Sequence, residues 1–122
     1  MTADLIAFLW ARLDEDEEVA RAATQGDWVW SREFVTPPGY HHRTVGPLEP
    51  GDAAHIARHD PSRALAEVEA KRRIVQAHAK WCEGRCEAKH PEGGFDAAHY
   101  WSVKSLAAVW DDHPDYRDEW RP

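Results

Sequence analysis

The chain has 122 residues, of which 43% are hydrophobic and seven are tryptophan, so it can bury one small core as a single domain over residues 1–122. Its net charge of −7 argues against direct binding to a nucleic-acid backbone. Two cysteines do not make a disulfide framework. No apolar run approaches ~20 residues and the N-terminus lacks the basic start of a signal peptide, so we expect a cytoplasmic protein without a membrane span.

The first predicted element is a helix that opens at Thr2 or Asp4 and ends before Gly26. Its apolar side combines Leu5, Phe8 or Leu9, Arg12 or Leu13, and Val19 or Ala20. Residues 14–18 are consecutive acids, whose side chains point all round a helix and cannot converge on one ion. We therefore interpret this acidic run as a solvated surface rather than a cation or partner site.

A small antiparallel hairpin is predicted at about residues 28–45. The run Trp28–Val35 is rich in β-branched and aromatic residues, Thr36–Gly39 has the composition of a turn, and Tyr40–Val45 can return as the second strand. The two tryptophans of the first run are two residues apart and share a face. Packing against a helix is the expected use of such a pair, and a ligand-stacking platform is the alternative.

A short helix is predicted next, with Asp52 as its N-cap. His55 and His59 lie four residues apart on it, a spacing that can bind a metal. No third ligand stands near them in a recognisable pattern. We interpret the two as histidines on a solvated helix face.

A long amphipathic helix over residues 61–83 is the centre of the predicted fold. Asp60 is a good N-cap, and Pro61 suits the first helical position. One face collects residues at steps of three and four: Ala64 or Leu65, Val68, Arg72, Val75, Ala79, Cys82 and Cys86. A third helix is predicted from Asp96 to about Asp111, followed by a tail. The fold class is therefore α+β, with three main helices and a small antiparallel β-hairpin.

The tail is predicted to be ordered rather than frayed. Tyr116 and Trp120 lie at i and i+4, a spacing at which two aromatic side chains on a short turn can dock together.

Potential soft metal ligands gather where the long helix ends: His78, Cys82 and Cys86 at four-residue steps, then His90 and His99. A straight helix would spread the first three over ~12 Å, too far for one ion. If Gly84 breaks the helix, Cys86 can fold back and four protein ligands can hold a structural zinc ion. The alternative is that the helix continues through Gly84 and the thiols are ordinary packing.

Three stretches resemble, in order and spacing, a family of small proteins from actinobacteria and their phages, domain-of-unknown-function family 6221. They are Phe8–Trp28, His55–Val75 and Asp111–Pro122. The resemblance implies no activity. Many members resemble each other in having a histidine in the place of His78, followed by a pair of cysteines and by a third cysteine before the last helix. This pattern resembles a zinc site. His99 lies roughly where that third cysteine would fall. The predicted zinc ligands are therefore His78, Cys82, Cys86 and His99, with His90 in reserve.

The function expected from these features is that of a small acidic binding or regulatory module, with a protein partner and no reaction of its own. One alternative is a metal-dependent hydrolase that uses some of the eight histidines. It would need an open metal position and a general base, whereas here the candidate ligands include thiols and no HExxH pairing supplies the base. Another alternative is an acidic inhibitor that mimics nucleic acid. Nucleophilic catalysis by Cys82 or Cys86 with His78 as base lacks a recognisable oxyanion loop.

Overall fold

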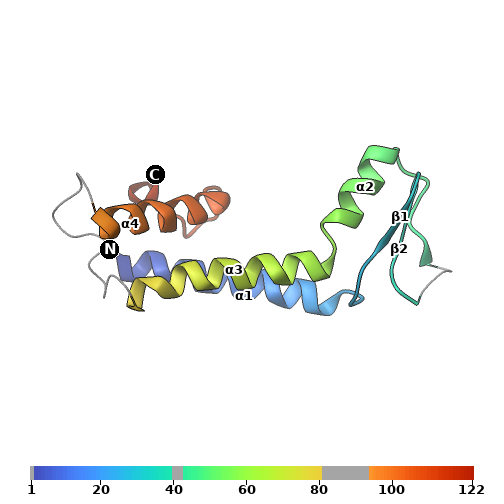
Figure 1. The fold of residues 1–122 in the computed structure, drawn as a ribbon. Helices are drawn as coiled ribbons and strands as arrows, with labels where there is room; N and C mark the ends of the chain where they lie inside the picture. The colour runs from blue at the N-terminus through green and yellow to red at the C-terminus, as the bar shows by residue number, and fades with distance from the viewer. Residues whose placement is uncertain (1, 40–42, 81–93) are drawn as a thin grey trace. The chain divides into compact units, whose positions relative to one another are not determined.

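A computed structural model of the chain describes residues 2–39, 43–80 and 94–122 (Figure 1). Within these ranges it has four α-helices and one two-stranded antiparallel sheet, which confirms the predicted α+β class. The elements are α1 (Thr2–Ala22), β1 (Val29–Ser31), β2 (Phe34–Thr36), α2 (Pro50–Arg58), α3 (Pro61–Lys80), α4 (Gly94–Ala107) and the short 3-10 helices η2 (Ala108–Trp110) and η3 (Asp118–Trp120). None of the described helices is both long and apolar enough to cross a membrane.

Contacts along the chain divide it into two compact units. The helical unit comprises Met1–Asp14 and Ala70–Pro122, and the hairpin unit comprises Glu15–Glu69. Both α1 and α3 contribute residues to each unit, because the division falls inside these two helices.

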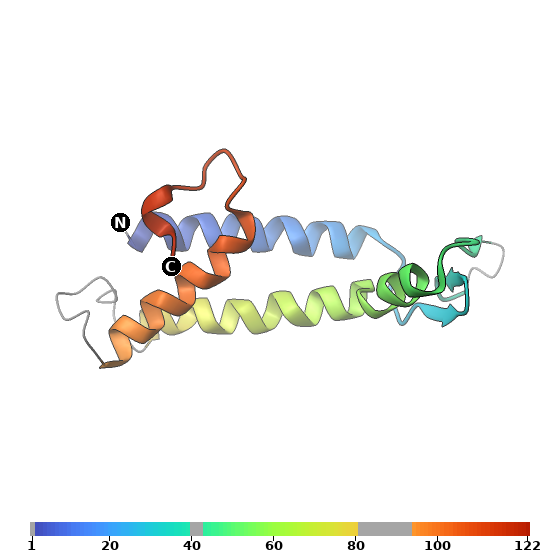
Figure 2. The ribbon, with the colours of Figure 1, turned by 90° about the horizontal axis from the view of Figure 1, so that it is seen from above.

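The helical unit is built on an apolar row of α1. Figures 1 and 2 show α4 on one face of the pair formed by the first half of α1 and the second half of α3. Side chains from all three helices are buried: Leu5, Phe8, Leu9, Leu13, Val75, Val103 and Ala107. The α1 members recur at steps of three and four, so they form one face of a helix. Arg72 of α3 pairs with Asp14 of α1 at 2.6 Å across this helix pair.

The long helix α3 begins where its cap predicts. Asp60 is buried, and its Oδ1 accepts the backbone N–H of Arg63 at 3.0 Å. Its Oδ2 accepts the backbone N–H of Trp28, also at 3.0 Å. One carboxylate therefore caps α3 and fixes the start of the hairpin. The predicted helix over residues 61–83 is confirmed as far as Lys80, and residues 81–83 lie outside the described part.

The hairpin is shorter than predicted, and the predicted position of its turn was wrong. The strands pair Trp30 with Val35 and turn at residues 32–33, where Arg32 has φ +53°. A two-residue turn with positive φ matches the right-handed twist of the strands. Pro37 and Pro38 end β2 instead of forming the hairpin turn, because proline cannot donate to the ladder. Trp30 leaves 51% of its surface exposed, against the expected packing.

The predicted return strand is reduced to a single bridge in the described residues. The N–H groups of Val35 and Val45 each donate to the other's carbonyl, at 3.0 and 2.8 Å. Gly46 then passes against the hairpin with φ +143°, where an added Cβ would lie 2.6 Å from the carbonyl oxygen of Glu33. Only glycine fits so close an approach in this conformation. The rest of the predicted strand includes residues 40–42, which lie outside the described ranges.

Two of the predicted helix starts were wrong. Helix α2 starts at Pro50 after Glu49, not at a cap formed by Asp52, because proline is preferred at the first helical position. Helix α4 starts at Gly94, ahead of Asp96. It passes into η2 and stops before Asp111, close to the predicted end.

Candidate functional site

The predicted zinc ligands are only partly described. His99 lies on α4 and is buried, with 6% of its surface exposed. The backbone of His78 belongs to the last turn of α3, but its side chain is outside the described part, as are Cys82, Cys86 and His90. In the residues that the structure does describe, no three His, Cys, Asp or Glu side chains form a group that could hold a metal ion.

The two histidines four residues apart are exposed, as predicted: His55 lies on α2 and His59 is its C-cap. The rings of His55 and His59 are 4.3 Å apart, and Nδ1 of His59 is 2.9 Å from the carbonyl oxygen of His55. The ring of His59 is thus turned back onto its own helix.

A cavity of about 270 Å³ lies in the helical unit, between the N-terminal half of α1 and the C-terminal segment. It is lined by Asp4, Ala7, Phe8, Ala11, Arg12, Asp115, Arg117 and Trp120. Every one of these residues belongs to the same compact unit. The cavity therefore lies between residues of α1 and residues of the C-terminal segment, and Figure 2 shows these two segments next to each other.

Helix α1 supplies one wall of this cavity through its local spacing. Phe8 and Arg12 are four residues apart and are both buried. Ala7 and Ala11, also four apart, are exposed and have no side-chain atoms beyond Cβ. These short side chains leave room beside Phe8 and Arg12. The open space of the cavity and the positive charge of Arg12 therefore lie on the same side of the helix.

The C-terminal segment supplies the opposite wall. It folds as two tight turns, in which Tyr116 donates its N–H to the carbonyl of His113 at 2.9 Å and Trp120 donates to that of Arg117 at 3.0 Å. The rings of these turns gather on Phe8, whose ring centroid is 5.1 Å from that of Trp120, 5.4 Å from His113 and 5.9 Å from Tyr116. Tilted and edge-to-face pairs at such distances are favourable.

The predicted docking of Tyr116 against Trp120 is confirmed. Their ring centroids are 5.7 Å apart and nearly perpendicular. The four rings are called the aromatic cluster below: Phe8, His113, Tyr116 and Trp120.

Two arginines stack on this cluster from the cavity. The guanidinium of Arg12 lies 5.0 Å from the centroid of the Phe8 ring, and that of Arg117 lies 5.3 Å from the centroid of the Trp120 ring. Arg12 is 8% exposed, and its Nη1 is 2.6 Å from Nε2 of His113. Arg117 is about half exposed and pairs with Asp4 at 3.1 Å. One cation is thus buried and the other lies at the rim.

Outside the cavity, a third arginine ties the segment to η2. Arg121 bonds Asp111 and Asp118, each at 3.2 Å, and these hydrogen bonds raise the pKa of its guanidinium. Burial raises the pKa of the Tyr116 hydroxyl, because the charged phenolate is disfavoured away from water. These contacts fix the turns that carry the cluster.

The aromatic cluster contains two buried donors that lack an acceptor among the described residues. They are the hydroxyl of Tyr116 and the indole Nε1–H of Trp120. Trp120 is 2% exposed, so its N–H is removed from water without a protein partner in this part of the chain.

The sequence reasoning did not find this cavity. The sequence marks only one of its residues, since Arg12 occupies a position in the apolar row of the first helix that is otherwise filled by leucine or phenylalanine. An arginine in such a row indicates a buried cation. The tail alternates charged and aromatic residues, a pattern that indicates charged groups beside aromatic rings.

The fold and the cavity define a small α+β protein whose C-terminal segment closes on its first helix. Residues 2–122 match the family described as "Family of unknown function (DUF6221)", and the chain belongs to that family. No curated protein and no solved structure matches the chain.

Proposed function

We propose that the chain is a small acidic binding or regulatory module that acts in the cytoplasm without a reaction of its own. The cavity between α1 and the C-terminal segment carries this proposal, because it combines a recognition surface with a firmly packed support. Aromatic walls and a few placed polar groups are what small-ligand sites use to bind and orient their ligands.

The packing behind the cavity supports a binding role. Phe8 and Trp120 are buried among one another's rings, so the cavity walls are held before any ligand arrives. A pre-formed site loses little side-chain entropy on binding. Regulation would follow if the bound ligand changed how firmly the C-terminal segment holds to α1.

A small-fragment screen by ligand-observed NMR tests the binding role. We expect a subset of fragments to bind the parent at one site and to be lost in Ala11→Leu, which places a larger side chain in the cavity. Ala98→Leu is the matched control, since Ala98 is an exposed helical alanine of α4 that does not line the cavity. Fragments that bind both variants as they bind the parent, or no fragments at all, would contradict the proposal.

We also propose that a structural zinc ion fastens the end of α3 to α4, held by His78, Cys82, Cys86 and His99, with His90 as the reserve ligand. The support is the chemistry of these side chains, because thiolates and imidazoles are ligands that zinc prefers and His99 lies on α4, after both cysteines in the chain. The sequence supplies two thiols and a histidine ahead of it. A four-ligand ion would contribute directly to folding.

Metal analysis of the untagged protein and cobalt substitution test the zinc site. Thiolate ligation of cobalt gives charge-transfer bands and tetrahedral visible absorption, which should disappear in a variant with Cys82→Ser and Cys86→Ser. That variant should also melt at a lower temperature. If the bands are missing and the variant melts like the parent, the zinc proposal is wrong, while the cavity proposal is unaffected.

A further inference from the structure

We propose that the cavity binds a small monocarboxylate, and most tightly one that also carries a positive charge, as an amino acid does. This inference rests on the proposed binding function and names the chemical class of the ligand. It is carried by two arginines and two carboxylates that line the same space, beside the rings of Phe8 and Trp120.

The donors match a carboxylate. Arg12 and Arg117 are planar cations with several N–H groups, a geometry that suits two oxygens in one plane. Arg12 is buried, so its charge acts through a medium less polar than water and attracts an anion more strongly.

The size of the cavity restricts the ligand to a small molecule. Its volume of about 270 Å³ lies just below the range of roughly 300–1,000 Å³ that is typical of pockets for drug-sized ligands. The small side chains of Ala7 and Ala11 keep this space open along α1. A short aliphatic chain of the ligand can lie against them and against the ring of Phe8.

The carboxylates in the lining argue against a doubly charged anion. Asp4 lines the cavity and lies in an ion pair with Arg117. Glu119 does not line the cavity but lies 3.7 Å from the same guanidinium. Asp115 is exposed at the rim and is a carboxylate that an incoming ammonium group can meet. Phosphate would face this negative charge, whereas a zwitterion would place its cationic end there.

Titration of the isotope-labelled protein tests the ligand class with five probes: 4-aminobutyrate, butyrate, butyramide, butylamine and inorganic phosphate. The readout is the indole N–H resonance of Trp120, assigned from its absence in Trp120→Phe. We expect saturable shifts with 4-aminobutyrate and butyrate, and at least about ten-fold weaker binding of butyramide, which has the same shape without the charge. Tighter binding of phosphate or butylamine than of butyrate would overturn the inference.

Arginine variants test the assigned donors. Arg12→Gln should weaken butyrate binding about ten-fold or more, and Arg12→Lys should weaken it less because the charge is kept. Arg63→Gln is the control, since Arg63 is exposed, pairs with Glu67 at 3.0 Å and does not line the cavity. If Arg12→Gln fails to fold, Ala11→Leu replaces it, and the butyrate shift must be lost there too.

Failure of this inference is distinguishable from failure of the proposed function. If the carboxylates bind no better than butyramide while fragments are still lost in Ala11→Leu, the ligand class is wrong and the cavity remains a binding site. If neither the probes nor the fragments respond to Ala11→Leu, both proposals are wrong.

Discussion

The helical unit and the hairpin unit reach stability by different means. In the helical unit, leucine, valine and aromatic side chains from distant parts of the sequence are buried against one another. Phe8 packs against Trp120, for example, although the two lie near opposite ends of the sequence. The hairpin unit buries smaller apolar side chains, such as Ala20, Val35 and Ala53, and joins its segments by hydrogen bonds to Asp60. The first unit therefore depends on apolar area and the second on a few polar contacts.

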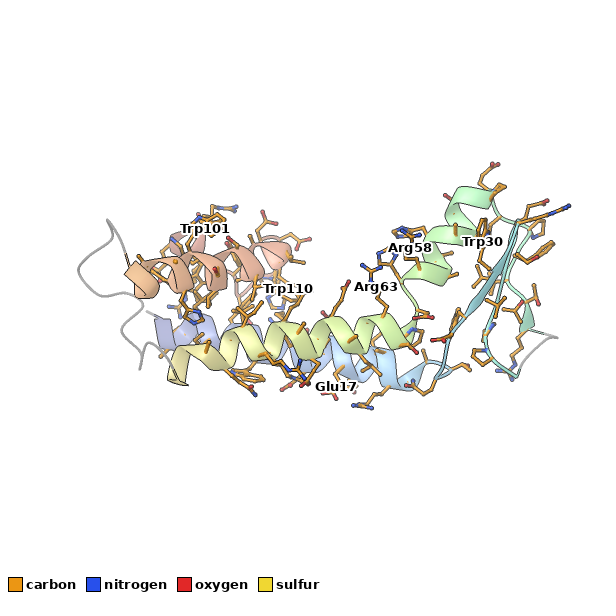
Figure 3. All side chains as sticks on the ribbon, viewed as in Figure 1. Glu17, Trp30, Arg58, Arg63, Trp101 and Trp110 are labelled. Carbon is orange, nitrogen blue, oxygen red and sulfur yellow. The ribbon has the colours of Figure 1, made fainter. Side chains whose placement is uncertain are left out.

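Exposed apolar surface follows the same division. Among the described residues, the large apolar side chains left exposed in the hairpin unit are Val19, Val29, Trp30, Phe34, Val45 and Ile56. In the helical unit they are Ile74, Trp101 and Val109. Figure 3 labels Trp30 and Trp101, one from each unit. A unit that leaves more apolar surface in water gains less from burial and needs its hydrogen bonds more.

The largest effect should come from removing the aromatic cluster. Trp120→Ala should lower the free energy of unfolding by about 3–5 kcal/mol, because it empties the space beside Phe8 and Tyr116. Deleting residues 114–122 should lower the melting temperature by at least several degrees for the same reason. Urea denaturation measures the first change and calorimetry the second.

Trp101→Ala is the matched control for this prediction. Trp101 is 60% exposed, so its removal should change the unfolding free energy by only about 0.5 kcal/mol. Equal effects of the two tryptophan substitutions would mean that the C-terminal segment does not hold to α1 through its rings.

A smaller loss is expected when the polar contact of the hairpin unit is broken. Asp60→Ala removes the cap of α3, worth about 0.5–2 kcal/mol, and leaves the N–H of Trp28 without its acceptor, at a further cost of about 1–3 kcal/mol. Asp60→Asn keeps one acceptor oxygen and should lose roughly half as much. Hydrogen exchange at the amide of Trp28 reports the local effect.

Asp52→Ala controls for loss of an acidic side chain near a helix start. Asp52 is exposed in the first turn of α2, so its removal should cost only about 0.3–1 kcal/mol. An Asp60→Ala variant as stable as Asp52→Ala would show that the hairpin unit is held by burial after all, and the contrast between the units would fail.

Local signals in the sequence predicted the helices well, because each depends on nearby residues. The cap by Asp60, the apolar rows and the docking of Tyr116 on Trp120 are all set within a few positions. The hairpin turn was misplaced because two prolines and a glycine are the usual punctuation of a turn, while Arg32 adopts a positive φ without any such signal. The position of the turn depends on how the two strands pair, which the turn residues alone do not indicate.

The cavity could not be predicted because it is a long-range feature. Phe8 and Arg12 were visible on the first helix, and Tyr116 and Trp120 on the tail, but nothing local says that these two segments meet. His99 was placed in a metal site because the family resemblance has a third cysteine roughly at its position, and that hypothesis concerns residues mostly outside the described ranges. The spacing of residues along the sequence identifies those that share one face of a helix or strand. It does not identify residues of distant segments that the fold places in contact.

The smallest effect is expected at the hydroxyl of Tyr116, which sharpens the view that the helical unit depends on apolar area. This hydroxyl is buried and has no acceptor among the described residues. Tyr116→Phe keeps the ring contacts and removes only the poorly placed polar group, so the unfolding free energy at neutral pH should stay within about 0.5 kcal/mol of the parent or rise slightly.

The same variant should change the response to alkaline pH. Burial raises the pKa of Tyr116 above its ordinary value of 10.0 in the folded protein, so the unfolded chain ionises first. This group therefore causes no pH-dependent loss of stability below pH 10.0, and the loss develops as the pH rises from there through the folded-state pKa. Urea denaturation at pH 8 and above pH 10 should therefore show a smaller alkaline loss for Tyr116→Phe than for the parent. An equal loss in both would mean that the hydroxyl reaches water, and that the C-terminal segment covers α1 less closely than the ring distances indicate.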